Sequence, residues 1–305
     1  MTYDVIIVGG GPAGFTAALY ASRASLKTLL IERFFSGGQM ATTEIMENYP
    51  GFEQPINGLD LAMQMEAQAK RFGAEVVFDE VTEVDLEGDV KTVKTAYSKF
   101  QGKTVILSMG ASPRALGVKG EGMFKGRGVS YCATCDGALF KDEEVAIIGG
   151  GDTAVEDANY LSRMCKKVYI VHRRDELRAV KVLQEKAFNN PKIEIVWDSV
   201  PDGILGNDTV EKLIVKNVKS EDLTTLNVAG VFVAIGSKPN TKLVAEKIKM
   251  SDYGYILTDE YMKTNIPGVF ACGDIREKPL RQVVTAASDG AIAAFFAEKH
   301  IEGIE

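Results

Sequence analysis

The chain of 305 residues has little of what several classes of protein require. It contains only four cysteines and two histidines, which excludes a disulfide-based scaffold and a metal site built from three histidines. No apolar run approaches the roughly 20 residues that a transmembrane helix needs. Lys and Arg (35) are outnumbered by Asp and Glu (42), so the basic footprint of a general nucleic-acid binder is missing. We therefore expect no membrane span, no nucleic-acid partner and no metal site.

The composition that remains is that of an ordinary globular protein. Apolar residues make up 46% of the chain and charged residues 25%. The length favours two domains, because single cores rarely grow far beyond about 250 residues. The sequence starts directly with an apolar strand and a glycine turn, without a basic leader or a small-residue cleavage site. We expect a cytoplasmic protein.

One pattern occurs twice along the chain. Residues 4–14 read DVIIVGGGPAG and residues 144–154 read EVAIIGGGDTA, and each copy predicts a buried strand, a glycine turn and a helix. A second apolar strand follows each copy, and a strand-Gly-x-x-Pro segment recurs at 105–115 and 231–241. The repeat predicts an α/β fold with two related Rossmann-like domains, each of three β/β/α layers, the second inserted into the first.

The two Gly-x-x-Pro segments are the natural joints between these domains, because proline ends a strand in an extended or turn conformation. We expect a discontinuous first domain at 1–113 and 243–305, and a second at 114–242. Helices are expected over Asp60–Phe72, over Ala179–Asn189 and after Arg281.

The first glycine motif is typical of a dinucleotide site. Gly9, Gly11 and Gly14 permit a tight turn and the close approach of a pyrophosphate to a helix N-terminus. Glu32 ends the next predicted strand, where a carboxylate accepts hydrogen bonds from the hydroxyls of an adenosine ribose. A glycine turn without a ligand is the alternative, and the strand, helix and acid around the motif argue against it.

The second motif is followed by bases instead of an acid. Glu32 lies 23 positions after Gly9, whereas His172 lies 23 positions after Gly149 and is followed by Arg173, Arg174 and Arg178. Guanidinium groups suit a 2′-phosphate, so this site is predicted to bind NADP(H). The alternative is a solvated, charged helix start. Because nicotinamide delivers hydride, FAD is the acceptor that we expect at the first site.

Cys132 and Cys135 have the spacing of a redox dithiol. A zinc site would need a second pair, whereas Cys165 and Cys272 are isolated among apolar residues and are expected to be packing cysteines. A thioredoxin-like module would continue into a long helix, whereas Lys141 and the acids after it lead into the second glycine motif. The interpretation that remains is a flavin-linked disulfide within the second domain.

These motifs together resemble the low-molecular-weight, bacterial-type thioredoxin reductases, a class of pyridine nucleotide-disulfide oxidoreductase. The resemblance covers essentially the whole chain. It rests on GGGPAG, GGQM at 37–40, ENYPG at 47–51, CATCDG, GGGDTA, HRRDELR, ACGDI at 271–275 and RQVVTAASDGAIAA at 281–294.

The resemblance implies an enzyme in which NADPH reduces FAD, FAD reduces the Cys132–Cys135 disulfide, and the dithiol reduces thioredoxin. It implies that Cys135 faces the flavin, that Cys132 is the interchange thiol, and that Asp136 manages the proton; a helix or turn cap is the alternative role for Asp136. A homodimer is also implied.

The resemblance further implies two sets of cofactor ligands. The FAD set comprises Gly9, Gly11, Pro12, Ala13, Gly14, Glu32, Arg33, Gly38, Gln39, Asn48, Gly110, Gly273, Asp274, Arg281, Gln282 and Val283. The NADPH set comprises Gly149, Gly151, Asp152, Thr153, Ala154, His172, Arg173, Arg174 and Arg178.

One departure concerns the partner surface. Relatives often carry aromatic residues directly after CATCDG, whereas Ala138 and Leu139 precede Phe140 here. A flavin disulfide reductase acting on another thioredoxin-like protein or on a small-molecule dithiol or disulfide is therefore an alternative. A non-enzymatic redox or metal sensor is a further alternative, which leaves two nucleotide motifs unexplained.

The positions of the motifs also predict motion. Nicotinamide and the disulfide both have to reach the flavin, and both belong to the inserted domain. We expect this domain to rotate between the half-reactions, with Ser112-Pro113 and Lys238-Pro239 as hinges. A static shared site is the alternative.

Overall fold

The computed structural model describes residues 2–43 and 45–304. The chain forms two compact units, of which the first contains residues 1–112 and 238–305 and the second contains residues 113–237. The second unit thus interrupts the first. The crossings lie at Ser112–Pro113 and Ser237–Lys238, and the later one precedes the expected boundary at 242/243 because Ser237–Pro239 pairs as a strand with Ala111–Pro113.

Unit 1 is built on one sheet in the order β3-β2-β1-β6-β5-β4, with β17 paired to β6. Strands β1, β2, β3, β6 and β17 run parallel, and the β4–β5 hairpin adds antiparallel strands. The strands are β1 (Thr2–Val8), β2 (Thr28–Glu32), β3 (Glu75–Phe78), β4 (Val81–Asp85), β5 (Lys91–Thr95), β6 (Lys99–Leu107) and β17 (Val269–Ala271).

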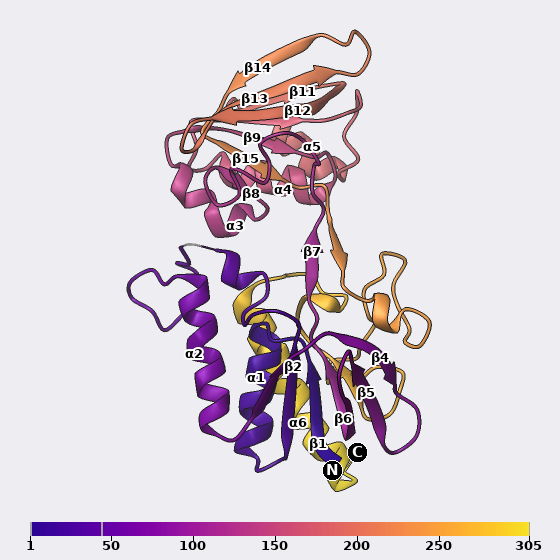
Figure 1. The fold of residues 1–305 in the computed structure, drawn as a ribbon. Coiled ribbons are helices and arrows are strands. Elements are labelled where there is room, and N and C mark those ends of the chain that lie inside the picture. The colour runs from indigo at the N-terminus through magenta and orange to yellow at the C-terminus, as the bar shows by residue number, and fades with distance from the viewer. Residues whose placement is uncertain (1, 44, 305) are drawn as a thin grey trace. The chain divides into compact units, whose positions relative to one another are not determined.

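Helices cover one face of this sheet. Helices α1 and α6 lie side by side and α2 packs against α1 (Figure 1). Apolar residues of α1, α6 and the strands form one core, and a second core fills the opposite face toward β4, β5 and the 244–275 segment. The helices are α1 (Pro12–Arg23), α2 (Gly58–Arg71) and α6 (Val283–Glu302), with 3-10 turns η1 (Met40–Thr42), η3 (Lys242–Val244) and η4 (Gly273–Ile275).

Unit 2 repeats this plan. Its parallel sheet has the order β11-β10-β9-β15-β8, which corresponds strand for strand to β3-β2-β1-β6-β17. The strands are β8 (Val129–Ser130), β9 (Glu144–Ile148), β10 (Lys167–Val171), β11 (Ile193–Val196) and β15 (Gly230–Val233). The second β layer is an antiparallel sheet of β12 (Ser199–Gly206), β13 (Val210–Asn217) and β14 (Leu223–Asn227). The helical layer comprises α3 (Ala133–Asp136), η2 (Gly137–Phe140), α4 (Asp152–Leu161) and α5 (Lys181–Phe188).

Two cores hold the layers of unit 2 together. One lies between the parallel sheet and the helices, and the other lies between the parallel and antiparallel sheets. The predicted α/β class, with two related three-layer folds of which one is inserted into the other, is confirmed.

The two crossings between the units form a ribbon of their own, in which β7 (Ala111–Pro113) pairs with β16 (Ser237–Pro239). Asn240 fastens one end, because its Nδ2 donates to the Met109 carbonyl at 2.8 Å and its Oδ1 accepts from Ser112 Oγ at 3.2 Å. Gly110 and Gly236 flank the ribbon with φ values of +64° and +95°. Both hinge candidates therefore belong to one ribbon.

Candidate redox and dinucleotide sites

Cys132 and Cys135 form a disulfide in unit 2, with their Cα atoms 5.3 Å apart. Cys132 follows β8 in an extended conformation and caps the single turn of α3, so its carbonyl accepts the Cys135 amide at 3.2 Å. The turn brings the two sulfur atoms together because residues three apart face the same side of a helix. The structure therefore contains the pair that the CATC spacing predicted.

Asp136 ends the same turn and is held from β8. Ser130 Oγ donates to its Oδ2 at 2.6 Å. The side chain makes no cap hydrogen bond at the start of η2, so it does not act as the helix cap that was the alternative. Burial raises the pKa of Asp136, and the hydrogen bond from Ser130 opposes that rise.

The two remaining cysteines are buried and unbonded. Burial raises the pKa of Cys165 to about 11 and raises the pKa of Cys272 as well. A thiol with a raised pKa carries little thiolate at neutral pH and is a poor nucleophile. Both cysteines pack in cores, as their apolar neighbours in the sequence suggested.

The residues after the pair divide between core and surface. The Phe140 ring packs edge-on against Phe232, with ring centroids 5.2 Å apart, whereas Leu139 is exposed. Gly230 leaves room for this ring, because a Cβ there would lie 2.6 Å from Cε1 of Phe140. In this stretch it is Leu139 that presents a large apolar side chain to solvent.

The first glycine turn joins β1 to α1, and two of its glycines, Gly9 and Gly14, leave no room for a side chain. A Cβ on Gly9 (φ +108°) would lie 2.5 Å from the Ser108 carbonyl oxygen, and a Cβ on Gly14 would clash with the Gly9 carbonyl. Ser108 Oγ hydrogen-bonds the Val8 and Gly9 carbonyls at 2.9 and 2.8 Å. Gly11 caps α1 next to Pro12, and nothing lies within 4 Å of its Cβ position. The open side of Gly11 permits the close approach that a pyrophosphate needs.

Glu32 is fixed beside this turn at the end of β2. Its Oε2 accepts the Gly10 amide at 2.6 Å, and its Oε1 accepts the amides of Arg33 and Phe34 at 2.7 and 3.2 Å. The Arg33 side chain pairs with Glu80 at 3.2 Å on the surface. The structure thus places the predicted ribose acid next to the predicted pyrophosphate turn.

One further predicted segment of unit 1 meets the same turn, and another meets the start of α6. The Gly37 amide donates to the Gly10 carbonyl at 2.7 Å, which sets the loop containing Gly38 and Gln39 beside the turn. Asn48 Nδ2 donates to the Gln282 side chain at 3.0 Å, although 234 positions separate these residues. Gly110 directly precedes β7 of the β7–β16 ribbon.

The stretch before α6 carries the remaining predicted FAD ligands. Gly273 has φ +75°, and a Cβ there would lie 2.8 Å from the Cβ of Ala13. Gln282 and Thr285 form a capping box at the start of α6, whose first residue is Val283. The Arg281 guanidinium stacks over Tyr255 at 4.1 Å. Among the described residues, Asp274 Oδ1 and Arg281 Nε are buried without a hydrogen-bond partner.

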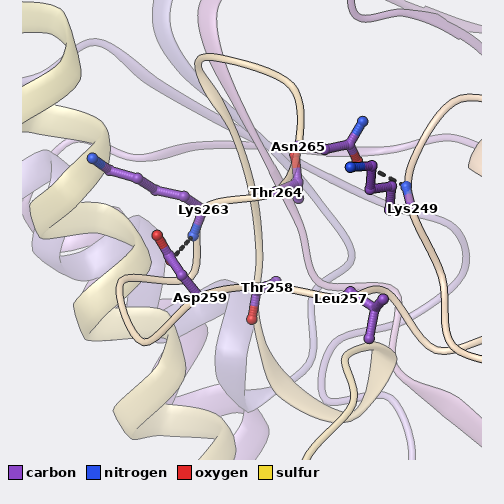
Figure 2. A pocket seen from close by; sticks show the side chains of 7 residues that line it. All are labelled: Lys249, Leu257, Thr258, Asp259, Lys263, Thr264 and Asn265. Carbon is purple, nitrogen blue, oxygen red and sulfur yellow. Dashed lines mark hydrogen bonds between the residues drawn. The ribbon is translucent and has the colours of Figure 1, made fainter.

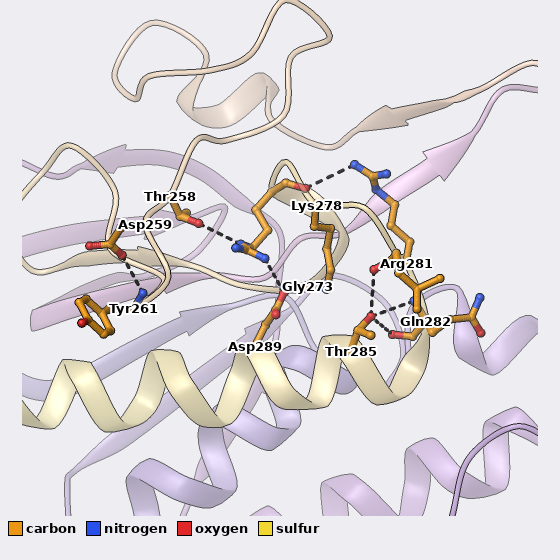
Figure 3. A network of polar contacts seen from close by, with 11 residues as sticks. Thr258, Asp259, Tyr261, Gly273, Lys278, Arg281, Gln282, Thr285 and Asp289 are labelled. Atoms are coloured by element: carbon orange, nitrogen blue, oxygen red, sulfur yellow. Dashed lines mark hydrogen bonds and ion pairs between the residues drawn. The ribbon is translucent and has the colours of Figure 1, made fainter. Parts of the chain in front are cut away.

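A charge network beneath this stretch was not predicted. Asp289 Oδ2 accepts from the Gly273 amide at 3.0 Å, from Lys278 Nζ at 2.8 Å and from Arg276 at 3.5 Å (Figure 3). The Lys278 and Asp289 side chains are only 4% and 10% exposed. Burial raises the pKa of the neighbouring Asp274, and Lys278 and Arg281 oppose that rise. The one sign of this network in the sequence is Asp289, a single acid within the run of small residues AASDGAIAA.

The second glycine turn repeats the first in unit 2. A Cβ on Gly149 would lie 2.5 Å from the Ala234 carbonyl oxygen and 2.7 Å from the Cβ of Ala154, whereas Gly151 caps α4 with open space around its Cβ position. Asp152 Oδ1 accepts the Val180 amide at 2.7 Å, and Thr153 is exposed in the first turn of α4. These predicted NADPH ligands therefore share one helix start.

His172 lies under this turn instead of in solvent. It is 4% exposed, and a Cβ on Gly150 would clash with its ring. Burial lowers the pKa of His172, and nearby Arg178 and Arg174 lower it further, which together outweigh two backbone hydrogen bonds that raise it and favour the uncharged ring. His172 thus supports the turn as an uncharged group.

The three predicted arginines are exposed on an irregular segment after β10. The Arg178 amide donates to the Gly150 carbonyl at 2.7 Å, which ties this segment to the glycine turn. Residues 173–178 form no regular helix, so the alternative of a charged helix start does not describe them. Three guanidinium groups beside a glycine turn suit a phosphate.

A separate hollow of about 260 Å³ lies in the 249–265 segment of unit 1 (Figure 2). Its shape is set by two side chain–backbone hydrogen bonds, in which Asn265 accepts the Lys249 amide and Asp259 accepts the Lys263 amide. Its lining contains no residue of the predicted sites: Lys249, Leu257, Thr258, Asp259, Lys263, Thr264 and Asn265. It plays no part in the chemistry described below.

Comparison with known proteins decides the family. Residues 3–290 match the family model described as pyridine nucleotide-disulphide oxidoreductase. The chain belongs to the pyridine nucleotide-disulphide oxidoreductase family. Members of this family use FAD and NADPH, and so does this chain.

Individual family members resemble the whole chain. It is 50% identical to a thioredoxin reductase of Peptoclostridium acidaminophilum over 306 residues, covering 98% of this chain and 97% of that protein. It is 48% identical to a thioredoxin reductase of Listeria monocytogenes, covering 99% and 95% respectively. The crystal structure of thioredoxin reductase from Streptococcus pyogenes is 46% identical, with a TM-score of 0.95 over 99% of both chains. The resemblance to thioredoxin reductases predicted from the motifs is confirmed.

The residues present fit both cofactors of this family. In unit 1, the open side of Gly11 and the buried, unpartnered polar atoms of Asp274 and Arg281 suit a polar dinucleotide. In unit 2, the open side of Gly151 and the exposed arginines suit a phosphate-bearing one. In residues 2–43 and 45–304, none of the helices combines the length and the apolar character that crossing a bilayer requires.

Proposed function

We propose that this chain is an NADPH-dependent thioredoxin reductase that works through the Cys132–Cys135 disulfide. The observation that carries the proposal is the position of this disulfide, on the second of two dinucleotide-type folds in a chain of this family. FAD bound in unit 1 would supply the two-electron chemistry that couples NADPH to the Cys132–Cys135 disulfide.

The chemistry of the dithiol follows from its residues. We assign Cys132 as the thiol that attacks the disulfide of oxidised thioredoxin. Its thiolate forms a mixed disulfide and releases one thioredoxin thiolate. The Cys135 thiolate then attacks the Cys132 sulfur, which restores the Cys132–Cys135 disulfide and releases the second thioredoxin thiolate. Cys135 is accordingly the thiol that we assign to the flavin side.

We assign the proton traffic of these steps to Asp136. Thiolates, not thiols, are the nucleophiles, so the carboxylate has to take a proton from the attacking thiol and return it to the departing thiolate. A carboxyl group whose pKa is raised toward neutrality suits both tasks.

The cofactor ligands are assigned by unit. We propose that the glycine turn, Glu32 and the 273–283 stretch of unit 1 hold FAD. We propose that the second glycine turn and Arg173, Arg174 and Arg178 hold NADPH, with His172 supporting the turn from below. The homodimer, the cytoplasmic location and the rotation of the inserted unit stay predictions.

Spectroscopy of two half-reactions tests the proposal. We expect NADPH to bleach the flavin absorbance of the FAD-loaded protein, and oxidised thioredoxin to restore it while thiols appear. A Cys135→Ser variant should still be bleached by NADPH and still reduce an artificial dye, yet it should form no thioredoxin thiols.

Cys165→Ala is the matched control, because it removes a free cysteine of the same unit and should leave thioredoxin reduction unchanged. Normal thioredoxin reduction by Cys135→Ser would show that the disulfide is structural.

A further inference from the structure

One buried hydroxyl connects Asp136 to the backbone of the redox pair. Ser130 ends β8 and is only 5% exposed. Its Oγ lies 2.6 Å from Asp136 Oδ2 and 3.3 Å from the Cys132 carbonyl oxygen, and it accepts the Cys132 amide at 3.1 Å. We propose that Ser130 is a positioning residue whose hydroxyl proton turns between Asp136 and the Cys132 carbonyl, so that Asp136 stays hydrogen-bonded in both of its protonation states.

The Ser130 hydroxyl has fewer protons than it has acceptors around it. A serine hydroxyl has one proton to donate and two lone pairs that accept. Two acceptors lie within hydrogen-bond distance of Oγ, so the proton serves only one of them at a time. The Cys132 amide is a fixed donor and occupies one lone pair in either case.

This geometry gives two complete arrangements. When Asp136 is a carboxylate, Ser130 donates to it. When Asp136 is a carboxylic acid, Asp136 donates to the second lone pair of Ser130, and Ser130 turns its proton to the Cys132 carbonyl. In each arrangement both groups keep their hydrogen bonds, which matters because an unpartnered polar group is costly at a buried site. The Ser130 proton never leaves its oxygen, so the proton balance of thiol exchange is unchanged.

In the surroundings of Asp136, the Ser130 hydroxyl is the polar group that hydrogen-bonds its side chain. Burial raises the pKa of Asp136, and the hydrogen bond from Ser130 opposes that rise. Its own turn carries Cys132 and Cys135. Helix α4, which packs against α3, carries Glu156, Asp157 and Tyr160, and Tyr160 Cε1 would lie 3.3 Å from a Cβ on Gly137.

The proposal rests on the proton role that the proposed function gives to Asp136. An acid–base group is a carboxylate in one part of each cycle and a carboxylic acid in the other. A partner that could hydrogen-bond only one of these two forms would stabilise that form over the other. A rotating hydroxyl keeps the return of the proton as accessible as its removal.

The test compares Ser130→Thr with Ser130→Val in the FAD-loaded protein. These side chains have nearly the same shape and both suit a strand, but only threonine keeps the hydroxyl. The rate at which the NADPH-reduced enzyme reduces excess thioredoxin is measured in single turnovers from about pH 5 to 9, where an acid–base group shows its midpoint.

We expect Ser130→Thr to keep the wild-type midpoint. Ser130→Val should move the Asp136 midpoint upward by about one pH unit, because the charged carboxylate loses a stronger hydrogen bond than the neutral acid does and then holds its proton more tightly. Below the midpoint, the Val variant should then be about tenfold slower than the Thr variant. Equal midpoints, or a Val defect of the same factor at every pH, would overturn the proposal.

Two further variants separate this idea from its foundation. In an Asp136→Asn background, Ser130→Val should cause no additional loss of rate. If the Asp136→Asn variant reduced thioredoxin at the wild-type rate, Asp136 would have no proton role in the proposed function. If Asp136→Asn were slow but the Ser130→Thr and Ser130→Val variants had equal midpoints, only the role of Ser130 would be rejected. Ser199→Ala is the matched control: it also removes a buried hydroxyl of unit 2, one that donates to the Trp197 carbonyl at 2.7 Å, and it should leave the midpoint unmoved.

Discussion

At the scale of single residues, Arg173 and Arg178 extend into solvent from the segment that follows β10. Charged hydrogen bonds to a phosphate typically contribute about 1.5–3 kcal/mol each, which corresponds to tenfold or more in affinity. We expect Arg173→Ala combined with Arg178→Ala to weaken NADPH binding at least tenfold and to leave NADH binding nearly unchanged, as measured by titration calorimetry.

Arg163→Ala is the control for this pair, because Arg163 is an exposed arginine of the same unit outside the predicted site. Equal losses for NADPH and NADH in the double variant would mean that the arginines do not read the 2′-phosphate.

Asp157 on α4 provides a prediction about pH. Burial and the nearby Glu156 raise its pKa from 3.8 to about 6. A carboxyl group with a raised folded-state pKa costs stability once the pH exceeds the unfolded-state value, and the full cost is present above pH 6. Asp157→Asn should therefore raise the free energy of unfolding at pH 8 by on the order of 2 kcal/mol and should change little near pH 4. Urea unfolding at the two pH values measures this, and an equal gain at both would contradict the prediction.

At the scale of elements, the sequence predicts positions well where periodicity is strong. The helix expected over Asp60–Phe72 is α2 (Gly58–Arg71), and the one expected over Ala179–Asn189 is α5 (Lys181–Phe188). The earlier start of α2 comes from Asn57, whose side chain accepts the Leu59 and Asp60 amides. Such a cap decides a boundary through one hydrogen-bond geometry, which periodicity does not contain.

The parts that escaped prediction are polar groups defined only by tertiary contacts. In the sequence, nothing distinguishes Ser130 from other strand serines or Lys278 from surface lysines. The structure shows that Ser130 bonds Asp136 and that Lys278 pairs with Asp289 of α6. The glycine turns and the CATC pair were predictable because their chemistry is local in sequence. The two pairs are 6 and 11 positions apart, and neither spacing belongs to a helix or strand pattern that would reveal it in the sequence.

The buried Lys278–Asp289 pair gives a prediction for α6. Removing one partner of a buried pair typically costs about 3–5 kcal/mol, and without Lys278 the Asp289 carboxylate keeps only the longer contact to Arg276 at 3.5 Å among the cations described around it. Lys278→Met should destabilise the protein and release FAD more readily, whereas Lys278→Met with Asp289→Asn should recover much of the loss, since asparagine still accepts the Gly273 amide. FAD release is followed by the rise in flavin fluorescence on heating.

Lys299→Met is the control, because Lys299 and Glu302 form an exposed pair on the same helix. Its effect should stay below about 1 kcal/mol. A double variant that is as unstable as the sum of both single variants would show that the pair is not coupled.

At the scale of the whole molecule, the β7–β16 ribbon contains both points at which the chain crosses between the units. If the inserted unit rotates between half-reactions, the ribbon has to accommodate that motion. Gly110 and Gly236 flank it with positive φ, and a Cβ at either position meets nothing within 4 Å. Alanine there thus introduces backbone strain without a clash, at about 1–2 kcal/mol.

We expect Gly110→Ala with Gly236→Ala to slow thioredoxin reduction roughly 5- to 30-fold, the factor that such strain imposes on a conformational equilibrium, and to slow dye reduction much less. Steady-state rates with the two acceptors measure the ratio. Gly88→Ala is the control, since Gly88 also has positive φ (+69°) and open space but lies in the loop between β4 and β5. Equal slowing with thioredoxin and dye would argue against rotation.

The pairing of β17 with β6 has a consequence for how the chain is made. Val269 pairs with Val105 across roughly 160 residues, a long loop to close for one pair of strands. Unit 2 is complete on the ribosome before β17 and α6 are synthesised, and domains generally fold as units as they emerge. Once unit 2 has folded, β7 and β16 lie together, and the effective loop shrinks to about 35 residues, those between Val105 and β7 and between β16 and Val269. Strand β17 then pairs with β6, which was synthesised much earlier. The folded inserted unit favours this pairing because it keeps the two connections together.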